Sequence, residues 1–138
     1  MTEAQIALAR RAVAAPGWRW MRGMRIADTK FARVVAVRDS GPCGAEEGPT
    51  GDDNAAVWLD DWTTATLLPD LSDPLTALGL LALVRERWGP MSCVVWDRDR
   101  KMWAVYSHMA MMVEEVWQPV AVGATEVEAL VVALEVTP

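Results

Sequence analysis

One expected helix, between residues 73 and 89, constrains the fold of this chain more than any other stretch. Asp73 suits the N-cap position because its carboxylate accepts hydrogen bonds from free amides of the first turn, and Pro74 fits the first helical position. Gly89, which is followed by a proline, marks the helix end. The apolar residues between these ends cover more than one helix face: Leu75, Leu78, Leu80, Leu81, Leu83 and Val84. We therefore expect a buried helix with the other elements packed around it.

The length and hydropathy of the chain predict one domain without a membrane span. The 138 residues are enough to bury a hydrophobic core, and we expect residues 1–138 to form a single domain. The longest apolar run, from Leu75 to Val84, is far shorter than the roughly 18 residues that cross a bilayer. The first residues carry charged side chains and lack the apolar core of a secretory signal. These features predict a cytoplasmic protein that does not bind membranes.

The charge of the chain is negative overall and unevenly distributed. A net charge of −6 argues against general binding to nucleic acid, whose phosphates favour basic partners. Residues 5–38 contain eight basic residues and one acid, whereas residues 39–84 contain nine acids and no base. Either the protein has a basic surface and an acidic surface, or the two segments are neighbours and neutralise each other.

Capping signals and hydrophobic patterns predict an α+β fold. Thr2-Glu3-Ala4-Gln5 and Thr125-Glu126-Val127-Glu128 resemble capping boxes at the start of an N-terminal and a C-terminal helix. Strand-like patterns occupy residues 18–26, 31–38, 55–59, 93–96, 102–106 and 117–122. Residues 109–117 fit either a helix or a strand. The order α-βββ-α-ββ(β)-α favours a mixed or antiparallel sheet packed with helices, an α-β-α sandwich.

Residues 39–54 are predicted to form a long mobile loop. They are rich in glycine, proline and acidic residues and contain no large apolar side chain. Cys43 lies in this loop and Cys93 in a strand-like run. A domain of this size does not require a disulfide, so we interpret both residues as free thiols.

Motifs for catalysis, metals and nucleotide cofactors are missing from the sequence. The acidic pairs Asp52-Asp53, Asp60-Asp61 and Glu114-Glu115 do not follow a calcium-loop pattern, and solvated charge accounts for them better than a metal site. Cys43 is surrounded by acids that suppress its thiolate, and His108 has no nucleophile motif to serve. No glycine-rich phosphate loop is present. We therefore predict no catalytic residues, no metal and no cofactor.

The sharpest local signal is a run of alternating tryptophan and arginine residues near the N-terminus. Indole faces stack on nucleobases and guanidinium groups bind phosphate through paired hydrogen bonds. This mixture predicts a site for an anionic, nucleotide-like ligand, formed by Trp18, Arg19, Trp20, Arg22 and Arg25. The alternative is that the two indoles fill the core while the arginines form a solvated surface. The eight tryptophans of the chain are too many for so small a core, so some are expected in a pocket or a subunit contact.

The order of these elements resembles small phage and prophage accessory proteins of the α-β-α sandwich type. The likeness lies in the Gly-Trp-Arg-Trp element after the first helix, the Pro-Asp-Leu-Ser-Asp-Pro run before the leucine-rich helix, the tryptophan-containing hairpin and the closing helix. It covers residues 1–25 and 69–136. The resemblance implies a phage-encoded protein in the host cytoplasm that acts on host defence.

Three functions are compatible with this interpretation. The first is a non-enzymatic, homo-oligomeric binding protein that sequesters an anionic nucleotide-like small molecule. The second is an inhibitor that binds a host defence protein through exposed tryptophans and the acidic loop. The third is a structural phage accessory protein.

Overall fold

The computed structural model describes residues 2–21, 23–27, 33–36, 57–58, 67–107 and 118–136, and for residues 33–36 and 57–58 it describes the backbone alone. Within these ranges the chain forms three helices and six short strands. Their order is α1 (Glu3–Ala14), β1 (Arg25–Ile26), β2 (Arg33–Ala36), β3 (Val57–Trp58), α2 (Pro74–Trp88), β4 (Cys93–Asp97), β5 (Met102–Tyr106), β6 (Ala121–Gly123) and α4 (Glu126–Glu135). The predicted α+β class is confirmed. The loop predicted at 39–54 and the ambiguous segment 109–117 lie outside the described residues.

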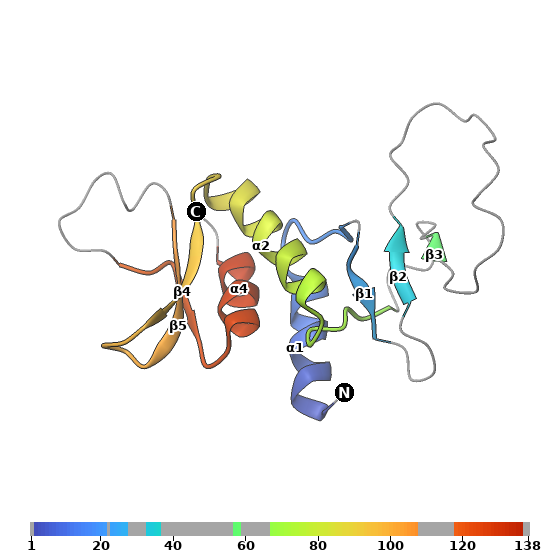
Figure 1. The fold of residues 1–138 in the computed structure, drawn as a ribbon, viewed down its shortest axis with the longest axis horizontal. Coiled ribbons are helices and arrows are strands. Elements are labelled where there is room, and N and C mark those ends of the chain that lie inside the picture. Colours follow the sequence, from blue (N-terminus) through green and yellow to red (C-terminus); the bar gives the residue numbers. More distant parts are fainter. Residues whose placement is uncertain are drawn as a thin grey trace.

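The strands form two small sheets on either side of the helices. In the first sheet β1 pairs antiparallel with β2, and β2 pairs parallel with β3. The second sheet has the order β4-β5-β6 and is antiparallel throughout. Helices α1, α2 and α4 lie between this second sheet and strand β1 (Figure 1). Among the described residues, no helix combines the length and the apolar character needed to cross a membrane.

The helices begin and end where the capping signals predict. The side chains of Thr2 and Gln5 form the reciprocal hydrogen bonds of a capping box before α1. Asp73 accepts a hydrogen bond of 2.9 Å from the backbone N–H of Thr76 at the start of α2. At the other end of α2, Gly89 has a positive φ of 104°, a conformation that favours glycine. Local chemistry therefore determines the boundaries of both helices.

One prediction about α2 is wrong, because the helix is buried on one side only. Leu80, Leu83 and Val84 are buried, but the side chains of Leu75 and Leu78 are 50% and 61% exposed. The helix packs against α4 and against the segment before β1 (Figure 1). These neighbours leave Leu75 and Leu78 uncovered. An apolar composition on most faces therefore did not mean burial on most faces.

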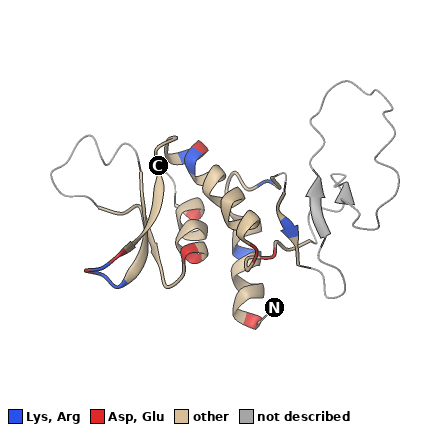
Figure 2. Cartoon of the chain, viewed as in Figure 1, with Lys and Arg blue, Asp and Glu red and all other residues tan. Residues whose placement is uncertain are grey.

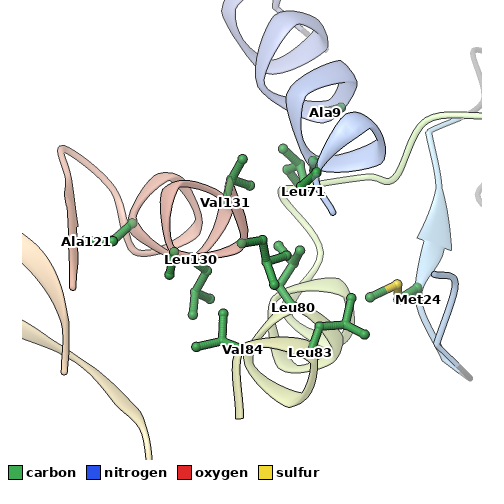
Figure 3. Packing of buried hydrophobic residues seen from close by; sticks show 14 of the residues in the cluster. Ala9, Met24, Leu71, Leu80, Leu83, Val84, Ala121, Leu130 and Val131 are labelled. Carbon is green, nitrogen blue, oxygen red and sulfur yellow. The ribbon is translucent and has the colours of Figure 1, made fainter. Parts of the chain in front are cut away.

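A single hydrophobic core joins the three helices. Figure 3 shows side chains of α1, α2 and α4 meeting between β1 and β6, among them Ala9, Leu80, Val84, Leu130 and Val131. Met24 reaches this cluster from the segment before β1, and Ala121 from β6. Each fully buried leucine or valine contributes about 1.5–3 kcal/mol relative to an exposed one. The core therefore fixes the Trp-Arg segment, residues 18–25, against α2.

Candidate functional site

The Trp-Arg segment runs alongside α2 in the opposite direction. Near its start, the guanidinium of Arg19 meets Glu86 in the last turn of α2. At its end, the backbone N–H of Arg25 donates to the hydroxyl of Thr76 in the first turn of α2, at 3.0 Å. Because a helix rises about 1.5 Å per residue, these two anchor points are roughly 15 Å apart along the helix. The structure thus separates Arg19 from Arg25.

The two tryptophans of this segment lie against each other and against the core. Their ring centroids are 5.7 Å apart, and the rings meet edge to face at 72°. Trp20 is 7% exposed, and its indole N–H is buried without a hydrogen-bond partner. Trp18 is half-buried and packs against the same core cluster. Trp20 is therefore a packing residue, while part of the surface of Trp18 stays accessible.

The described arginines of the segment each pair with an acid of α2 or its cap. Arg19 Nη2 lies 2.6 Å from Glu86 Oε1, and this hydrogen bond raises the pKa of Arg19 and lowers the pKa of Glu86. Arg25 Nε lies 3.4 Å from a carboxylate oxygen of Asp73. Arg22 lies outside the described residues. These acidic partners were not predicted from the sequence.

Arg19 lines a small pocket together with Arg87. The pocket has a volume of about 200 Å³ and lies between the turn after α1 and the last turns of α2 and α4. Arg87 Nη1 donates to the backbone carbonyl of Pro16 at 2.8 Å. The Nε–H of Arg87 is buried and has no acceptor. Arg19, Glu86 and Arg87 therefore line one concave site, which we call the Arg19–Arg87 pocket.

A second, larger groove lies between α1 and the start of α4. Its volume is about 500 Å³, and its walls are mainly apolar, with Leu8, Leu71 and Val127 among the lining residues. Its polar lining includes Arg11. Arg11 forms two hydrogen bonds with Glu135, of 2.9 and 2.7 Å, which join α1 to α4. The guanidinium of Arg11 is therefore already paired with Glu135.

The other described tryptophans occupy half-buried and exposed positions. Trp88 donates from its indole to the carbonyl of Ala133 at 2.8 Å, which ties α2 to α4. Trp96 and Trp103 meet edge to face with centroids 6.0 Å apart, and Trp96 is 49% exposed. Trp96 is therefore at the surface, and the expectation that some indoles line a pocket or a subunit contact stays a prediction. Trp62 and Trp117 lie outside the described residues.

The hairpin between β4 and β5 holds the most strongly perturbed carboxylate of the described chain. Hydrogen bonds from the backbone N–H and the guanidinium of Arg100 lower the pKa of Asp97 to about 2, with help from the hydroxyl of Tyr106. Blue and red residues lie close together at this tip and at the end of α2 (Figure 2). Most of the acidic stretch 39–84 lies outside the described residues, so the choice between separate and neighbouring charged surfaces stays open.

The described residues contain no group of three acids, cysteines or histidines able to hold a metal ion. Cys93 is a free thiol, as predicted. Cys43, His108 and the three acidic pairs singled out from the sequence lie outside the described residues.

The chain matches no protein-family model, and comparison with curated proteins and with solved structures finds no similar protein.

Proposed function

We propose that this chain is a non-enzymatic binding protein that sequesters an anionic, nucleotide-like small molecule in the Arg19–Arg87 pocket. The observation that carries the proposal is that two arginines, Arg19 and Arg87, line one concave site. Guanidinium groups bind phosphate and carboxylate through paired, charge-assisted hydrogen bonds.

The size of the pocket limits what enters it. A volume of about 200 Å³ lies below the 300–1,000 Å³ typical of sites that enclose a whole small molecule. We therefore expect a single phosphate or carboxylate group to sit between Arg19 and Arg87. The remainder of the ligand would extend along the surface, where half-buried Trp18, next to Arg19 in the chain, offers an indole for stacking.

The five residues chosen from the sequence have different parts in this proposal. Trp18 and Arg19 belong to the site, and Trp20 supports Trp18 through their edge-to-face contact. Arg25 pairs with Asp73 at the far end of α2 and contributes to stability instead. The contribution of Arg22 stays a prediction.

Ligand-induced stabilisation tests the proposal. The full chain is heated with inorganic phosphate and with a panel of linear and cyclic nucleotides. A ligand present at 100 times its dissociation constant should add about 2.7 kcal/mol to the free energy of unfolding. The Arg19→Gln variant should lose this stabilisation, whereas Arg10→Gln, which removes an exposed arginine of α1, should keep it. Failure of every member of the panel to stabilise the protein would refute the proposal.

The resemblance to phage accessory proteins suggests a biological role. We propose that the sequestered molecule is an anionic signal used in host defence against phage. Expression of the wild-type chain should then weaken a signal-dependent defence of the host, and expression of the Arg19→Gln variant should not.

Exposed leucines favour a second candidate function, the inhibition of a host protein. Leu75 and Leu78 lie one turn apart on α2 and share an exposed face. Exposed apolar side chains gathered in this way are typical of a protein contact. A host protein captured by the wild-type chain should be lost with the Leu75→Glu and Leu78→Glu double variant. It should be kept with Val136→Glu, a control at another exposed apolar position.

A further inference from the structure

Strand β4 is an edge strand of the second sheet. It pairs with β5 on one side, and no described residue hydrogen-bonds to its other side. An edge strand presents a row of free N–H and C=O groups that can pair with another strand.

The register of the sheet identifies the outward-facing backbone groups. The carbonyl of Val105 accepts from the N–H of Val120, so the backbone groups of Val105 point away from β4. Backbone groups alternate in direction along a strand, and those of Ala104 therefore point toward β4. Ala104 is paired with Val95, whose backbone groups point back toward β5. The N–H and C=O groups of Val94 and Trp96 consequently face outward.

Four of the five residues of β4 lack the features that normally prevent strand pairing, and Asp97 at the hairpin end is the exception. Residues 93–96 contain no charged residue and no proline, although edge strands are usually protected by such residues. Val95 is 42% exposed and Trp96 is 49% exposed, and Met91 just before the strand is 63% exposed. Apolar surface thus accompanies the free backbone groups of the same strand.

We propose that two copies of this chain form a two-fold symmetric dimer by pairing their β4 strands in antiparallel orientation. A two-fold axis through Val95 places Val94 of each copy opposite Trp96 of the other, so that two such pairs form. Both outward-facing residues of each strand then exchange hydrogen bonds with the second copy. The subunits of a two-fold dimer contact each other through the same surface. Strand β4 meets this condition, because its outward-facing residues pair with the same residues of a second copy. The two three-stranded sheets become one sheet of six strands.

The side chains agree with this register. The two Val95 residues meet at the axis as a pair without hydrogen bonds between them, the arrangement in which side chains approach most closely. Asp97, the one charged residue of β4, faces Cys93 of the second copy, so no like charges are brought together. The exposed flank of Trp96 is covered by the added strand.

Sedimentation of the full chain over a range of concentrations tests the dimer. We expect a monomer–dimer equilibrium for the wild-type protein. Val95→Lys should shift the equilibrium toward monomer, because two ammonium groups would meet at the two-fold axis. The variant should still fold, because the replaced side chain is exposed. Ala14→Lys, at an exposed position of α1, is the matched control and should leave the equilibrium unchanged. A wild-type protein that is monomeric at every concentration overturns the proposal, and so does a Val95→Lys variant that dimerises like wild type.

Cysteine cross-linking tests the register separately. In a variant with Cys43→Ser and Cys93→Ser, Val95→Cys places two thiols on Cα atoms about 4.5 Å apart, which a disulfide can span. Oxidation should therefore yield a covalent dimer. Trp96→Cys in the same background, with its thiol opposite Val94 of the second copy, should cross-link far less. Preferential cross-linking at position 96 would contradict the axis through Val95.

This dimer does not depend on the Arg19–Arg87 pocket. The proposals of ligand binding and of dimerisation can therefore be confirmed or refuted independently.

Discussion

The guanidinium of Arg19 and the carboxylate of Glu86 lie 2.6 Å apart and connect the Trp-Arg segment to the last turn of α2. An anion that enters the Arg19–Arg87 pocket must compete with Glu86 for Arg19 and is repelled by the same carboxylate. The pair therefore makes binding weaker than two free arginines would.

Replacement of Glu86 should accordingly strengthen binding of an anionic ligand. We expect Glu86→Gln to lower the dissociation constant severalfold, because the side chain keeps its shape and loses its charge. Titration calorimetry with the tightest ligand of the nucleotide panel measures the change. Glu3→Gln removes an exposed acid of α1 and should have no effect. Weaker binding by Glu86→Gln would mean that the ligand does not approach Arg19 as an anion.

Stability at low pH should depend on Asp97. Its pKa is lowered to about 2 in the folded protein, mainly by hydrogen bonds from Arg100, from a reference value of 3.8. The ionised carboxylate therefore stabilises the fold at pH values above about 4, and this contribution is lost as the pH falls toward 2. Melting temperatures of wild type and Asp97→Asn, measured between pH 2 and 6, should differ most at the upper end and converge at the lower end. A difference independent of pH would exclude ionisation of Asp97 as its cause.

Replacement by alanine should destabilise the fold to different degrees at two glycines. A methyl group at Gly123 of β6 would collide with the backbone of Ala129 in α4, and neither element can move freely. Gly123→Ala should lower the free energy of unfolding by about 1–3 kcal/mol. At Gly79 in α2 a methyl group would displace the buried side chain of Met24, and this cost offsets the gain of up to about 1 kcal/mol in helix propensity. Urea unfolding should show Gly79→Ala to be the milder change of the two.

The helix boundaries could be predicted from the sequence because they depend on neighbouring residues. Asp73 caps α2 by accepting from Thr76, three positions along the chain, and Gly89 ends the helix in a conformation that suits glycine. The hairpin of β4 and β5 is equally local, since a short charged turn joins two strand-like runs.

The partners of the charged residues could not be predicted in the same way. Arg19 meets an acid 67 positions away, and nothing near Arg19 in the sequence distinguishes Glu86 from the other acids of the chain. The exposure of Leu75 and Leu78 is another such case. Their surroundings depend on how the helices are layered, and the apolar pattern of α2 alone does not contain that information.

The buried hydroxyl of Thr76 links the end of the Trp-Arg segment to α2 and should matter for stability. It accepts from the backbone N–H of Arg25 at 3.0 Å and donates to Asp73 at 3.2 Å. Thr76→Val keeps the shape of the side chain but leaves that N–H without an acceptor, at a cost of about 1–3 kcal/mol in the free energy of unfolding. Thr76→Ser retains the hydroxyl and should recover most of the loss, as measured by urea unfolding. If valine were as stable as threonine while serine was less stable, packing of the methyl group rather than the hydrogen bonds would hold this segment against α2.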